Sequence, residues 1–75
     1  MSSIEQLDQL VQTAREAGIV VRHEYFGGTG GGLCHVAGKS VLFIDLALSS
    51  ADQLERVREI MIEENILPAR QRRAS

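Results

Sequence analysis

The sequence predicts an α+β domain in which a helix, a three-stranded antiparallel meander sheet and a second helix follow one another, with both helices on one face of the sheet. Two segments with apolar residues at three- and four-residue spacing flank a central region rich in β-branched and aromatic residues. A chain of 75 residues has room for one domain. We assign that domain to residues 1–68 and a basic, flexible tail to residues 69–75.

Each predicted helix begins near a serine that has a glutamine three residues later. The first helix covers residues 4–17, where Ser3 and Gln6 have the spacing of a capping box. Ser50 and Gln53 have the same spacing at the start of the second helix. Both segments carry one apolar stripe, as expected for helices that pack on a sheet.

Three segments are predicted to be strands, at residues 19–26, 33–37 and 41–46. Five glycines in the six positions 27–32 predict a loop between the first two strands. Gly38 and Lys39 predict a two-residue hairpin of type II′ between the last two strands. Because the third segment holds an uninterrupted apolar run, we expect it to be the central strand.

One face of this sheet is expected to have little cover, because the two helices of so short a chain cover only the other face. The uncovered face should carry Phe43 or Leu42, and an uncovered apolar sheet face is a common dimerisation surface. We therefore predict Leu42 and Phe43 as interface residues. The small core of a 75-residue chain, which is marginal for a monomer, also favours association.

The charge distribution and the cysteine count argue against several classes of protein. Residues 1–64 hold five basic and ten acidic side chains, and such an acidic body does not suit phosphate backbones, so no nucleic-acid partner is expected. The longest apolar stretch, residues 41–48, is interrupted by Asp45 and is too short to span a membrane. The chain does not start like a secretory signal, and its single cysteine, Cys34, cannot form an internal disulfide. We therefore expect a cytoplasmic protein without a membrane partner.

The glycine-rich loop has the composition of a phosphate-binding segment, but its spacing fits neither of the common nucleotide motifs. The P-loop pattern and the dinucleotide fingerprint both require a glycine where Leu33 stands. Ser40 is also followed by a predicted strand, whereas a P-loop leads into a helix. We therefore interpret the Gly-Lys-Ser segment as a hairpin turn.

A backbone nest in the glycine loop is the alternative ligand site that the sequence leaves open. Its candidate residues are Gly28, Gly30, Gly31, Cys34 and His35, which would hold an anion, a small molecule or a metal. Cys34 and His35 are adjacent on a strand and so point to opposite faces, which favours a structural thiol over a shared ligand. We predict no catalytic residue, no metal ligand and no cofactor.

Two further polar positions have residue types that occur in chemical sites. Asp45 interrupts an apolar strand, and without a visible partner acid or nucleophile we interpret it as a structural cap of the hairpin or of the following turn. His23 and Glu24 begin like the zinc-protease motif H-E-x-x-H, but the second histidine is missing. No zinc site is expected there.

Four stretches of the sequence resemble a family of small bacterial proteins of unknown function. The pattern of that family is a leucine-rich helix, then G-I-x-V-R-x-E, G-G-x-C, G-[KR] and L-x-[IV]-[DN], and a second helix. The matching stretches here are residues 18–24, 31–34, 38–39 and 42–45. This resemblance covers nearly the whole chain and implies a single α+β domain but no activity.

The order of strand, hairpin, strand and helix also resembles the N-terminal half of the ImmA/IrrE-type zinc metallopeptidases. The helix of that family carries H-E-x-x-H, and the matching residues here are 58–62. Glu59 stands at the position of the general base, but Arg58 and Ile62 replace the two zinc-binding histidines. The resemblance therefore implies a truncated, metal-free relative.

These observations predict a non-enzymatic protein–protein interaction module that forms a homodimer or binds a larger protein. The alternative is a binder of a small molecule, an anion or a metal through the loop 27–32 with Cys34 and His35. Two further possibilities are an enzyme subunit whose site a partner completes, and a nucleic-acid regulator that uses the basic tail.

Overall fold

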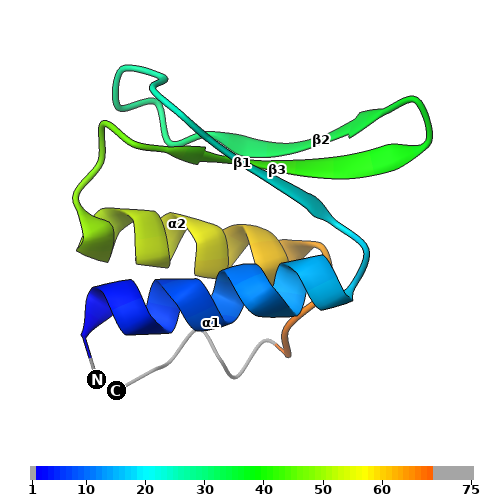
Figure 1. Cartoon of the computed structure of the whole chain (residues 1–75), viewed down its shortest axis with the longest axis horizontal. Helices are drawn as coiled ribbons and strands as arrows, with labels where there is room; N and C mark the ends of the chain where they lie inside the picture. The colour runs from blue at the N-terminus through cyan, green and yellow to red at the C-terminus, as the bar shows by residue number, and fades with distance from the viewer. Residues whose placement is uncertain (1, 69–75) are drawn as a thin grey trace.

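Two helices and three strands follow one another along the chain in the predicted order (Figure 1). They are α1 (Ser3–Glu16), β1 (Val20–Glu24), β2 (Gly32–Val36), β3 (Lys39–Asp45) and α2 (Ser50–Glu63). This computed structural model describes residues 2–68, so the predicted basic tail lies outside the described residues. The α+β class is confirmed. Neither of the described helices combines the length and the apolar character needed to cross a membrane.

The sheet has the order β1-β3-β2, in which β1 runs parallel to β3 and β2 runs antiparallel to it. The predicted antiparallel meander is therefore wrong in its strand order and in one of its two pairings. The physical reason is the glycine-rich connection, residues 25–31, which carries the chain past the end of β3 to the far edge of the sheet (Figure 1). As its apolar run predicts, β3 is the central strand.

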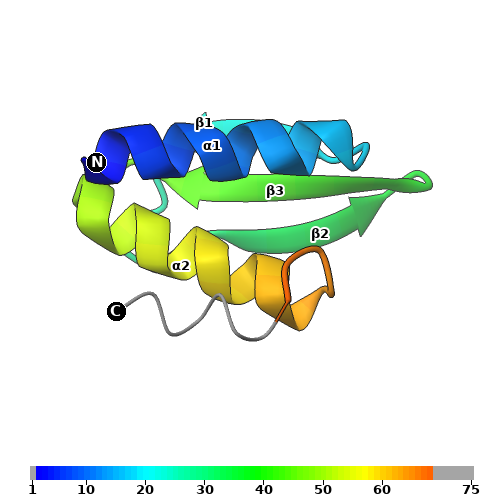
Figure 2. The same ribbon diagram turned by 90° about the horizontal axis from the view of Figure 1, so that it is seen from below.

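Both helices lie on one face of the sheet, and the core is between the two layers (Figures 1 and 2). Leu42 and Ile44 of β3 point into this core, and each is 1% exposed. Val57 and Met61 of α2 and Ala14 of α1 pack against the same cluster. The small side chain of Ala14, which is fully buried, allows α1 to approach closely.

Both helix starts lie one residue earlier than the capping-box spacing predicts. The hydroxyl of Ser2 accepts a hydrogen bond from the amide of Glu5, and the Glu5 carboxylate accepts one from the amide of Ser2. The hydroxyl of Ser49 accepts a hydrogen bond from the amide of Asp52 and so caps α2. Each predicted cap is the second of two adjacent serines, and the first serine has the extended backbone that a cap requires.

The hairpin between β2 and β3 turns at Ala37 and Gly38, one residue before the predicted pair. Val36 and Lys39 are paired across the strands, and both central residues have positive φ, 52° and 80°. Two positive φ values define a type I′ turn, so the predicted type II′ turn is wrong. Ala37 holds a left-handed conformation that costs an L-residue roughly 1–2 kcal/mol.

Candidate functional site

The carboxylate of Asp45 lies at the end of β3 and accepts four backbone hydrogen bonds. Its Oδ1 accepts from the amides of Phe26 at 3.0 Å and Ala47 at 2.9 Å. Its Oδ2 accepts from the amides of Gly28 at 2.8 Å and Gly30 at 3.0 Å. Asp45 is 1% exposed, so it acts as an internal acceptor for a loop whose amides have few other partners.

The environment of Asp45 keeps it ionised. Burial raises the pKa of the carboxyl, but the backbone hydrogen bonds together outweigh burial, and the pKa lies below its ordinary value. A charged carboxylate that is saturated by main-chain donors is a poor general base, because its lone pairs are already in use. Asp45 is therefore a structural residue that shapes the glycine loop.

Gly31 shows how closely this loop lies on the central strand. A Cβ atom at Gly31 would overlap the carbonyl oxygen of Phe43 and would lie 2.9 Å from its carbonyl carbon. Gly31 also has a φ of +67°, which L-residues rarely adopt. Only glycine therefore fits here without a shift of the β3 backbone.

The side of the sheet opposite the helices forms a continuous surface, which we call the open face. The strand register places on it Val20, Arg22 and Glu24 of β1, Lys39, Val41 and Phe43 of β3, and Cys34 and Val36 of β2. Figure 1 shows both helices on the other side of the sheet. Apart from the Arg22–Glu24 ion pair, which measures 3.0 Å, and the ammonium of Lys39 at the hairpin end, these side chains are apolar or weakly polar. Val20 is 43% exposed and Val36 is 55% exposed.

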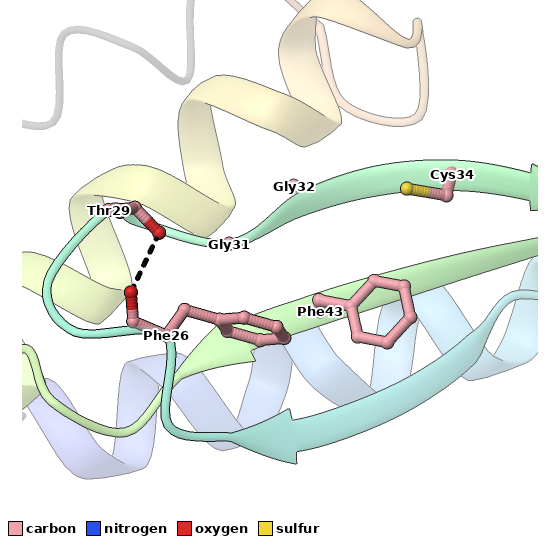
Figure 3. Close-up of a pocket in the computed structure, with 6 residues that line it drawn as sticks. All are labelled: Phe26, Thr29, Gly31, Gly32, Cys34 and Phe43. Carbon is pink, nitrogen blue, oxygen red and sulfur yellow. Dashed lines mark hydrogen bonds between the residues drawn. The ribbon is translucent and has the colours of Figure 1, made fainter.

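A hollow of about 280 Å³ lies where the glycine loop meets the open face (Figure 3). Its lining residues are Phe26, Thr29, Gly31, Gly32, Cys34 and Phe43. The rings of Phe26 and Phe43 meet edge to face, with centroids 5.6 Å apart. The hydroxyl of Thr29 donates a hydrogen bond to the carbonyl of Phe26 at 3.0 Å, which fixes the turn above the hollow.

Of the five residues proposed for an alternative ligand site, Gly31 and Cys34 lie together at the hollow, and the other three do not join them there. The amides of Gly28 and Gly30 point at Asp45 and so are not available to an external anion. Cys34 is exposed beside the hollow, whereas His35 lies on the helix side of the sheet, where its Nδ1 is 3.0 Å from the hydroxyl of Ser40. Within residues 2–68, no group of three or more His, Cys, Asp or Glu side chains could hold a metal ion.

The two predicted interface residues are separated by the sheet. Phe43 lies on the open face, next to the hollow. Leu42 lies on the opposite side, beneath the helices, and is 1% exposed, so the expectation that it forms a surface contact is corrected. The reason is the two-residue alternation of a strand, which sends neighbours to opposite faces.

Sequence reasoning missed Phe26 and Val36 as members of the exposed surface. The alternation of residues 20–26 already placed Phe26 on one face with Val20 and Arg22, and this was the available signal. The hydrogen bonds between Asp45 and the glycine loop leave no comparable pattern in the sequence. Their donors are backbone amides, which every residue type except proline provides.

Comparisons with protein-family models, with curated protein sequences and with solved structures find no match for this chain. The resemblances to a small bacterial family and to the metallopeptidases therefore remain hypotheses.

Proposed function

We propose that this protein is a non-enzymatic interaction module in which the open face of the sheet binds the open face of a second copy. The observation that carries the proposal is the apolar surface around Phe43, which lies opposite the helical layer. Two sheets of this kind pack face to face about 10 Å apart, and their side chains then form a shared core. The proposal also places the protein in the reducing cytoplasm, where the exposed thiol of Cys34 would stay free.

The distribution of charge favours a second copy as the occupant of this face. The two helices carry seven acidic and three basic side chains, so two helical layers would repel each other. The sheet and its connections, residues 20–45, carry two acidic and two basic side chains, and one of these, Asp45, is buried. The exposed charges of the open face are Arg22, Glu24 and Lys39, a net charge of +1 among apolar side chains, so two open faces repel each other far less than two helical layers would, and the acidic helices stay in solvent.

The size of the face predicts a reversible contact. The helical and sheet layers are stacked one above the other (Figure 1). The three strands have 5, 5 and 7 residues, so at about 3.3 Å per residue and about 4.8 Å between strands the open face covers roughly 300 Å², well below the roughly 800 Å² that each partner buries in a standard interface. We therefore expect association that depends on protein concentration.

The test compares two charged substitutions at exposed apolar residues. Val36→Glu places a charge on the open face, and Ile4→Glu is the matched control on α1, where Ile4 is 61% exposed. Both sites are exposed, so neither change should unfold the domain, and circular dichroism checks this. The solution mass of each variant is then measured by sedimentation equilibrium over a range of concentrations.

The expected result is that the mass of Val36→Glu falls to half that of the unsubstituted chain, while Ile4→Glu keeps the full mass. The reason is that the contact would take the new carboxylate out of water, and its cross-strand neighbour Lys39 would have to be desolvated with it. Equal masses for Val36→Glu and the unsubstituted chain would overturn the proposal. A folded chain that stays at 8.2 kDa at every concentration would overturn it as well.

A further inference from the structure

The outer edge of β1 carries backbone groups that no other strand pairs with in the described part of the chain. β1 is a terminal strand of the sheet, with β3 as its only neighbour there. The amide of Leu46, just beyond β3, donates to the carbonyl of Glu24 at 2.9 Å, so the polar groups of Glu24 face inward. By alternation, Val21 and His23 turn their amides and carbonyls outward. Such an edge is a template for another strand.

The sequence around β1 is complementary to itself when it is reversed about His23. The residues one position before and after His23 are Arg22 and Glu24, which face each other in the reversed copy as an opposite-charge pair. Two residues away, Val21 corresponds to Tyr25, which is apolar against aromatic. Three residues away, Val20 and Phe26 make a second apolar pair.

The exposure of these side chains supports such a pairing. Tyr25 is 77% exposed and Val20 is 43% exposed, and both are among the exposed large apolar residues of the domain. In an antiparallel pair of β1 strands, each of them would meet an apolar side chain of the other copy. Cross-strand aromatic and β-branched pairs are among the stabilising combinations in sheets.

We propose that two copies of this chain join through β1, antiparallel, with His23 opposite its own counterpart. The outward backbone groups of His23 then form a hydrogen-bonded pair, and Arg22 faces Glu24 of the other copy at a closely spaced position. A register centred on Arg22 or on Glu24 would place like charges opposite each other. Only the register centred on His23 joins both charge pairs and both apolar pairs.

This contact produces a continuous six-stranded sheet. Its two-fold axis is perpendicular to the sheet, so both open faces lie on the same side of it. The open surface doubles to roughly 600 Å², which approaches the roughly 800 Å² per partner of a standard interface. The edge contact does not depend on the open-face contact, but together they would give a symmetric assembly of four copies.

The charge pairs provide a test that separates contacts between chains from contacts within one chain. In Arg22→Glu the two facing positions are both acidic, and in Glu24→Arg they are both basic. Each change turns two attractive cross-strand pairs into repulsive ones, so each variant alone should associate at least about tenfold more weakly. Mixing the two variants restores both opposite-charge pairs, but only between unlike chains.

The experiment is done by native mass spectrometry on chains that also carry Val36→Glu, which removes the open-face contact. The expected result is a dimer for the Val36→Glu reference, monomers for each charge variant alone, and a one-to-one heterodimer in the mixture. The intrachain Arg22–Glu24 ion pair is lost in both variants, but its side chains are 60% and 44% exposed, so the fold should not depend on it. Thermal unfolding followed by circular dichroism checks that both variants are folded.

A disulfide tests the register directly. In a background of Cys34→Ser and Val36→Glu, which removes the open-face contact, His23→Cys places two thiols at facing positions about 5.5 Å apart between Cα atoms, within the range of a disulfide. The matched control is Val20→Cys, which faces Phe26 of the other copy and lies about 20 Å from its own counterpart. Mild oxidation should crosslink the His23→Cys chain and leave the Val20→Cys chain monomeric on a denaturing gel.

The edge contact is overturned if the mixture of folded charge variants shows no heterodimer, or if Val20→Cys crosslinks as readily as His23→Cys. Neither outcome bears on the open face, because every chain in these experiments carries Val36→Glu, which removes the open-face contact. Loss of mass in Val36→Glu alone, with a β1 heterodimer present, would support both contacts. A monomeric Val36→Glu reference would support the open-face contact alone and overturn the edge contact.

Discussion

Replacing Gly31 with alanine is expected to destabilise the domain more than replacing Gly27, although both glycines have positive φ, +67° and +70°. The left-handed backbone costs an L-residue roughly 1–2 kcal/mol at either position. At Gly27 a Cβ would meet nothing within 4 Å, so this conformational cost is the whole effect. At Gly31 it would overlap the backbone of Phe43, and the strand itself must shift.

The size of the difference follows from that clash. Forcing one extra carbon into a packed site costs about 1–3 kcal/mol, so Gly31→Ala should lose about 2–5 kcal/mol in all. A domain of this length has a total stability of about 4–11 kcal/mol. Gly31→Ala is therefore expected to remove a large part of it, while Gly27→Ala removes a small part.

Urea unfolding followed by circular dichroism measures both variants against the unsubstituted chain. The free energy of unfolding is compared at equal slope, because a changed slope would signal a change in the unfolded or native state. Equal losses for Gly31→Ala and Gly27→Ala would contradict this prediction, since they would show that the loop does not lie on β3.

The other predictions concern single hydrogen bonds and backbone conformations. Asp45→Asn should be less stable at neutral pH. The pKa of the Asp45 carboxyl is lower in the folded state than in the unfolded state. Its contribution to the free energy of unfolding is therefore complete above the unfolded-state pKa and is lost as the pH falls through the folded-state pKa. Urea titrations of Asp45→Asn and of the unsubstituted chain should converge in acid. Ala37→Asn should stabilise the type I′ hairpin by about 1 kcal/mol and raise the melting temperature by about 4–8 °C; no rise would contradict the assigned turn. Ser2→Ala should lower the free energy of unfolding by about 1 kcal/mol, and Ser3→Ala should lower it very little. A larger loss for Ser3→Ala than for Ser2→Ala in calorimetry would show that Ser3, and not Ser2, caps α1.

The helices and strands were predictable because each has a periodic pattern that depends on neighbouring residues alone. The order of the strands was not, because the same three patterns fit a meander and the observed order β1-β3-β2. The apolar run of β3 did indicate a central strand, and in a meander the second strand along the chain would be central instead. That run therefore favours the observed order over a meander.

The candidate site was predictable in part. The presence of an uncovered sheet face followed from the number of helices, and Phe43 lies on it. Leu42 was misplaced because an apolar run without alternation does not reveal which residues face the helices. The role of Asp45 in holding the loop depends on contacts between segments about 15 residues apart, and these cannot be read from local spacing.

The proposal of an interaction module is tested most directly by the solution mass of the unsubstituted chain, measured beside Val36→Glu by sedimentation equilibrium at neutral pH. We predict that the unsubstituted chain forms a multiple of 8.2 kDa and that Val36→Glu has half of its mass at the same concentration. The same mass for both chains, or a folded monomer of 8.2 kDa from micromolar to millimolar concentrations, would contradict it.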